Sequence, residues 1–81
     1  DVKDVASKVE IFPNPTNGTI YFKDEKKQDV SKIEIWSSLG ELIYKSDYLP
    51  ETLTLEQYSE GLYLVKIYKG DKVQIEKIIL N

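Results

Sequence analysis

The chain has 81 residues, contains no His, Cys, Met or Arg, and carries a formal net charge of −3. Without His or Cys, it offers no Ser/His/Asp triad, no thiolate nucleophile and no zinc cluster, so an enzyme is the least expected class. The acidic balance and the missing Arg also argue against nucleic acid as a partner.

The apolar content is sufficient for one small folded domain, because Leu, Ile, Val and Phe make up 25 of the 81 residues. No apolar run reaches the roughly 20 residues of a membrane helix, so we expect no direct membrane insertion. A translated chain begins with Met, whereas this one opens at Asp1 and contains none. We therefore expect it to be a processed part of a longer protein.

Residues 1–8 fit no strand pattern and mix charged with small side chains. We interpret them as the stub of a linker to an upstream partner; the alternative is a frayed terminus. The remaining residues, 9–81, are expected to form one domain.

Composition favours strands, since the chain has one Ala against 28 Val, Ile, Thr and aromatic residues. Alternation of apolar and polar residues predicts seven short strands, separated by Gly, Pro, Asn and Asp turn signals. Seven strands with a turn about every ten residues are typical of an all-β, antiparallel sandwich. The predicted strands lie at residues 9–11, 20–22, 33–36, 42–45, 53–55, 62–68 and 73–76.

The first turn has the sequence Pro13-Asn14-Pro15-Thr16-Asn17-Gly18. Its two prolines fix φ and remove backbone donors, which ends the first strand, and Asn17-Gly18 favours a tight turn into the second. Turn chemistry is a sufficient explanation of these residues. A rigid docking loop is the alternative.

The aromatic side chains allow two interpretations. They could form a stacking platform for sugars, but a lone Trp in a small sandwich is more often packed, and we favour packing. The residues concerned are Trp36, Tyr21, Tyr44, Tyr48, Tyr58 and Tyr68.

The longest predicted strand begins with Gly61-Leu62-Tyr63. A Gly two residues before a Tyr resembles a tyrosine corner, in which the hydroxyl bonds a backbone group a few residues upstream. Lys66 lies on one face of this strand, so the core face is expected to carry Tyr63, Val65 and Ile67.

Near the C-terminus, alternation breaks at the three consecutive apolar residues Ile78-Ile79-Leu80. A bulge, a strand buried on both faces, or an exposed apolar edge open to another protein's strand would each explain the break. An exposed edge would also permit an edge-strand dimer of the isolated module.

Taken in order, these motifs resemble the C-terminal sorting domain of the type IX secretion system, the type A sorting family. Where the family more often has Tyr or Phe followed by Asp, this chain has Trp36-Ser37, which questions the local turn. The matching segments are Val9 to Gly18, Ile33 to Glu41, Leu55 with Gly61-Leu62-Tyr63, and Lys77-Ile78-Ile79-Leu80.

The resemblance implies a seven-stranded antiparallel immunoglobulin-like β-sandwich at the C-terminus of a larger exported cargo. Such a domain is a non-enzymatic secretion signal that needs no cofactor. In a Gram-negative bacterium the cargo would pass the periplasm, be recognised by outer-membrane translocon and shuttle proteins, and reach the cell surface or medium. A surface cysteine protease with sortase activity would then remove the domain, by a cut at or before residues 1–8.

The expected sites are therefore recognition and folding sites, with no catalytic, cofactor-binding or metal-binding residue. A carbohydrate-binding or adhesive sandwich, with an exposed aromatic row including Trp36, is the alternative function, and a plain spacer is a third. Recognition is assigned to the tail, Lys77, Ile78, Ile79, Leu80 and Asn81, with help from Pro13, Asn14 and Pro15; folding is assigned to Gly18, Gly40, Gly61 and Tyr63.

Overall fold

The computed structural model describes residues 8–24 and 30–81, and every element in that part is a strand. The predicted linker up to residue 7 and residues 25–29 of the charged loop lie outside the described residues. All seven predicted strands are present, with small differences at their ends. They are β1 (Glu10–Phe12), β2 (Thr19–Lys23), β3 (Lys32–Ser37), β4 (Leu42–Ser46), β5 (Thr52–Thr54), β6 (Gly61–Lys69) and β7 (Lys72–Leu80).

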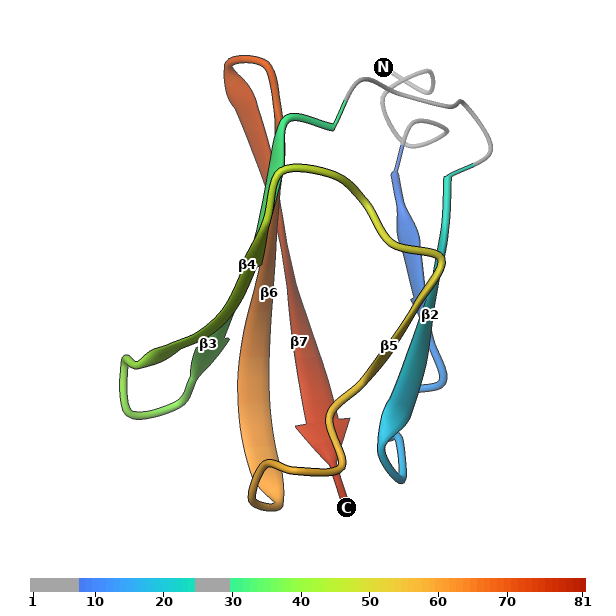
Figure 1. Cartoon of the computed structure of the whole chain (residues 1–81), viewed down its shortest axis with the longest axis vertical. Helices are drawn as coiled ribbons and strands as arrows, with labels where there is room; N and C mark the ends of the chain where they lie inside the picture. The colour runs from blue at the N-terminus through green and yellow to red at the C-terminus, as the bar shows by residue number, and fades with distance from the viewer. Residues whose placement is uncertain (1–7, 25–29) are drawn as a thin grey trace.

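The strands form two sheets, one of three strands in the order β1-β2-β5 and one of four in the order β4-β3-β6-β7. Every paired strand is antiparallel to its neighbour. Figure 1 shows the two sheets facing each other, with β7 and β1 along one side of the sandwich. This architecture confirms the predicted seven-stranded antiparallel sandwich.

The core lies between the sheets and follows the period-two pattern of the strands. On β6, Tyr63, Val65 and Ile67 are buried, which confirms the predicted core face. Ile33 and Ile35 of β3 lie beside them, because β3 pairs with β6 in continuous register. Burial of each such Ile or Leu side chain contributes roughly 1.5–3 kcal/mol to the free energy of folding. The rest of the core is Val9, Ile20, Phe22, Leu55, Ile78 and Leu80.

The tyrosine corner is present at the start of β6. The Tyr63 hydroxyl donates a hydrogen bond of 2.5 Å to the carbonyl of Ser59, four residues upstream. A second hydroxyl, that of Tyr58, donates to the Ile43 carbonyl at 3.0 Å and ties the same segment to β4. These two bonds hold the β5–β6 connection against the four-stranded sheet.

Gly18 occupies a position where the backbone of a residue with a Cβ atom would be strained. Its φ is +148°, and a Cβ there would lie 2.6 Å from Cγ of Glu56. The Gly18 carbonyl also accepts a hydrogen bond of 2.6 Å from the Leu55 amide. This close approach gives a physical reason to expect a folding role for Gly18.

Tyr63→Phe removes a partly buried hydroxyl and leaves the Ser59 carbonyl without its partner. We expect it to lower the free energy of unfolding by roughly 1–3 kcal/mol, measured by urea denaturation. Tyr48→Phe is the matched control, because Tyr48 is 67% exposed. Equal stability of the two variants would contradict a stabilising corner.

Candidate functional site

The first loop and the C-terminal tail, far apart in sequence, lie side by side in the structure. The Thr16 amide donates to the Ile79 carbonyl and the Asn81 amide donates to the Thr16 carbonyl, both at 2.8 Å. Thr16 and Leu80 thereby form a parallel bridge. The structure thus brings together the two segments that sequence analysis singled out for recognition.

Asn14 extends this pairing with its side chain. Its Nδ2 donates to the Lys77 carbonyl at 2.8 Å, and its Oδ1 accepts from the Ile79 amide at 3.0 Å. One side-chain amide therefore provides a donor and an acceptor, as a peptide group of a neighbouring strand would. The loop, residues 14–16, covers the outer edge of β7 along residues 77–81.

The prediction of an open edge is therefore wrong for the end of β7. The bulge is also wrong, because β6 and β7 pair in unbroken register from Gly61 and Leu80 to their turn. Burial of the strand on both faces is wrong as well, because one of the three apolar side chains is exposed. Ile78 and Leu80 are buried and point into the core, whereas Ile79 is 46% exposed. The apolar run consists of two core residues with one outward side chain between them.

Thr16 and Gln74 make contacts that the sequence patterns did not indicate. Thr16 is buried, and its hydroxyl donates to the Thr19 carbonyl at 2.6 Å and accepts from the Gly18 amide at 3.1 Å. Gln74 of β7 exchanges two hydrogen bonds with the backbone of Val9, at 2.8 and 3.0 Å. The Thr-x-Gly spacing is a local turn signal for Thr16, but no signal in the sequence marks Gln74.

Of the residues assigned to folding, Gly18 lies in the turn before β2, and the other three lie in two further places. Gly61 and Tyr63 pair directly with Leu80 and Ile78 of the tail, so they lie beside the recognition segments. Gly40, with a φ of +89°, lies instead in the turn between β3 and β4.

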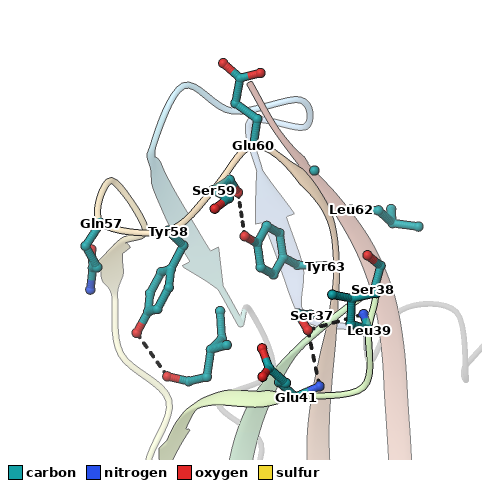
Figure 2. A pocket seen from close by; sticks show the side chains of 12 residues that line it. Ser37, Ser38, Leu39, Glu41, Gln57, Tyr58, Ser59, Glu60, Leu62 and Tyr63 are labelled. Carbon is teal, nitrogen blue, oxygen red and sulfur yellow. Dashed lines mark hydrogen bonds between the residues drawn. The ribbon is translucent and has the colours of Figure 1, made fainter.

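A hollow of about 300 Å³ lies next to the tyrosine corner, between the β3–β4 turn and residues 57–63. Figure 2 shows hydrogen bonds between three of its polar side chains, those of Ser37, Tyr58 and Tyr63, and backbone groups. Ser37 Oγ accepts from the amides of Leu39 and Glu41, at 3.3 and 3.2 Å. The Ser37 hydroxyl therefore organises the β3–β4 turn.

The described aromatic rings are divided between different parts of the sandwich. Phe12 and Tyr21 stack on the three-stranded sheet, with ring centroids 5.8 Å apart. Trp36 is half-buried on the four-stranded sheet, whereas Tyr44 and Tyr58 pack against the core. Packing is thus confirmed for Tyr44 and Tyr58, whereas Tyr21 and Tyr48 are exposed, and the rings do not line up in one row.

Glu34 is the centre of a polar network on the four-stranded sheet. Its Oε1 accepts from the Tyr68 hydroxyl at 2.8 Å and from Trp36 Nε1 at 3.1 Å, and Lys32 Nζ lies 3.5 Å from Oε2. Burial by itself raises the pKa of Glu34, but these hydrogen bonds and the Lys32 charge outweigh it, so the pKa lies below its usual 4.5. The bond to Glu34 raises the pKa of Tyr68.

The match to a protein family decides what this domain is. The model of the secretion system C-terminal sorting domain matches residues 10–81, nearly the whole chain. The chain belongs to this sorting-domain family. The membership confirms the type IX family indicated by the motifs, and it implies a secreted or cell-surface protein. The family is one of sorting signals and is in general non-enzymatic.

The fold of this sorting domain recurs within a known secretion component. It is similar to part of PorZ, an essential bacterial surface component of the type-IX secretion system of Porphyromonas gingivalis, with a TM-score of 0.65 and 18% sequence identity. The similarity covers 90% of this chain and 11% of PorZ. No curated protein matches the sorting domain in sequence.

Residues 8–24 and 30–81 contain no group of three or more His, Cys, Asp or Glu side chains placed to hold a metal ion. They also contain no helix long and apolar enough to cross a membrane.

The Glu34 network makes the stability of the sorting domain depend on pH. Because its folded pKa is lowered, ionised Glu34 stabilises the fold above about pH 4.5 and loses this effect as the pH falls through the folded pKa. We expect Glu34→Gln to be less stable than the unmodified chain at neutral pH by roughly 1–2 kcal/mol, with the gap closing in acid. Thermal unfolding of both proteins between about pH 7 and pH 3 measures this difference in stability. A difference that stays constant with pH would contradict the role of ionised Glu34.

Asn14→Ala removes both bonds from the Asn14 side chain to β7. The Ile79 amide then loses its acceptor, so we expect its hydrogen exchange to accelerate roughly tenfold, measured by NMR. Asn17→Ala, in the same loop, is the matched control and should leave the Ile79 amide unchanged. Unchanged exchange in Asn14→Ala would show that Asn14 does not hold the tail.

Proposed function

We propose that this sorting domain is the C-terminal secretion signal of a larger cargo protein, which it directs across the outer membrane through the type IX secretion system. The observation that carries the proposal is the pairing of residues 14–16 with residues 77–81 in a chain of this family. The pairing presents two separate motifs of the sequence as one surface.

The tail residues contribute to this signal in two ways. Ile78 and Leu80 are 1% and 4% exposed, so they act through the fold. Lys77 and Ile79 are exposed on the opposite face of β7, and with the terminal Asn81 they are available for contact. Pro13, Asn14 and Pro15 are exposed as well, and Asn14 holds the tail in place.

We also propose the route of the cargo. The cargo passes through the periplasm, outer-membrane translocon and shuttle proteins recognise the folded domain, and the cargo arrives at the cell surface or in the medium. A surface cysteine protease with sortase activity then cuts at or before residues 1–8, which link the domain to the cargo. Val9 belongs to the core, which supports a domain boundary at about this residue.

Secretion of a fusion protein tests the signal. A fluorescent protein with an N-terminal export signal is joined to the 81-residue chain and expressed in a bacterium that has a type IX system. We expect fluorescence outside the cells to require both the chain and an intact translocon. External fluorescence that persists without the translocon would overturn the proposed function.

A single substitution tests the tail better than a deletion, because removing residues 77–81 also removes core side chains. We expect Ile79→Asp to fold, as shown by circular dichroism, but to lower secretion roughly tenfold, since the loss of a central apolar contact worth about 1.4 kcal/mol weakens binding by that factor. Leu39→Asp is the matched control, because Leu39 is 88% exposed in the β3–β4 turn. Normal secretion of Ile79→Asp would remove the tail from the recognised surface.

A further inference from the structure

The outer face of the four-stranded sheet carries more apolar surface than a solvated sheet needs. Side chains alternate along each strand, so those between the core residues of β6 and β7 lie on this face. Four of them are 40–52% exposed; the cross-strand pair of Leu62 with Ile79 places two of these side by side, and Val73 and Ile75 lie opposite Tyr68 and Lys66. The four are Leu62, Val73, Ile75 and Ile79.

The face has a hollow beside Trp36. This space, about 390 Å³, is lined by Trp36, Leu62 and Leu64, with Lys66 and Lys77 at its sides. Lys66 Nζ lies 5.2 Å from the centroid of the Trp36 ring, within the range of a cation–π contact. Three apolar side chains and two Lys side chains thus line the same hollow, together with Ser37, Ser38 and Gly40.

The charge of this face is opposite to that of the chain. Four Lys and one Glu give the face a net charge of +3, whereas the chain carries −3. The one carboxylate, Glu34, is 8% exposed and is bonded to Tyr68, Trp36 and Lys32. Among the described residues no ion pair neutralises the remaining Lys side chains, which are Lys45, Lys66 and Lys77.

We propose that this face is a docking surface for a segment of another protein that carries apolar side chains beside Asp or Glu. An apolar side chain of the partner enters the hollow at Trp36, and its carboxylates meet Lys66 and Lys77. The inference extends the proposed function, because Lys77 and Ile79 of the tail belong to the same face.

Two other occupants fit the charges less well. A second copy of this chain would bring two faces of +3 together, which opposes pairing. An anionic bilayer attracts dense clusters of basic residues, whereas the four Lys residues of this face are spread over four strands and lack the density of a polybasic segment. A complementary protein segment meets both the apolar and the cationic features.

The only Trp of the chain, Trp36, reports occupancy directly by its fluorescence. The purified 81-residue chain is titrated with three synthetic peptides: one alternating Asp with Leu, one alternating Lys with Leu, and one alternating Asp with Ser. We expect the Asp–Leu peptide to change the Trp36 emission, the other two to do so at least tenfold more weakly, and added salt to weaken the response.

Two charge reversals on the face have a control on the same strand. We expect Lys66→Glu and Lys77→Glu each to weaken binding of the Asp–Leu peptide roughly tenfold. Lys72→Glu is the matched control, because the Lys72 side chain lies on the other face of β7 from Lys77. This variant should bind the Asp–Leu peptide normally. Circular dichroism shows whether each variant is folded.

Four results would overturn the inference: no response to any peptide up to about 1 mM, binding unchanged by both charge reversals, a Trp36 response to vesicles of anionic lipid, or a dimer in sedimentation that buries Trp36.

These measurements use no secretion system. A chain that binds the Asp–Leu peptide but is not secreted would refute the proposed function and leave the surface standing, and the converse result would do the opposite.

Discussion

The structure depends on which groups pair with the backbone amides and carbonyls at the outer edge of β7. An edge strand presents unpaired amides and carbonyls, and a C-terminal edge strand is also free to fray. Here Asn14 and Thr16 supply the missing partners, and Gln74 joins β7 to Val9 further along the same edge. The sandwich is thereby closed on one side by side-chain amides and a single bridge, without an eighth strand.

Closing the edge in this way leaves the outward side chains of the tail accessible. Ile78 and Leu80 complete the core, while Ile79 between them is exposed. The backbone of the tail is therefore held by the first loop, and its side chains are divided between folding and contact. For the secretion signal that we propose, this division is useful, because the backbone of the tail is held while its outward side chains stay accessible.

The same sheet combines a rigid interior with an unusual exterior. The tyrosine corner and the bond from Tyr58 to Ile43 hold the β5–β6 connection against it. On the outer side, Glu34 satisfies Tyr68 and Trp36, so these two aromatic side chains are held in place by a charged group. The remaining Lys side chains and exposed aliphatic residues form the surface that we assign to an acidic, apolar partner.

The sequence by itself determined the seven strands, the core face of β6, the tyrosine corner and the sorting-domain family, because alternation, turn residues and motif order are local signals. Only the tertiary structure decided where the edges and faces lie. The pairing of Asn14 with Ile79 joins residues 65 apart in sequence, and the Glu34 network joins β3 to β6. Local patterns do not encode such long-range contacts, which is why an open apolar edge was one of three explanations of the tail, although the first loop in fact covers its backbone.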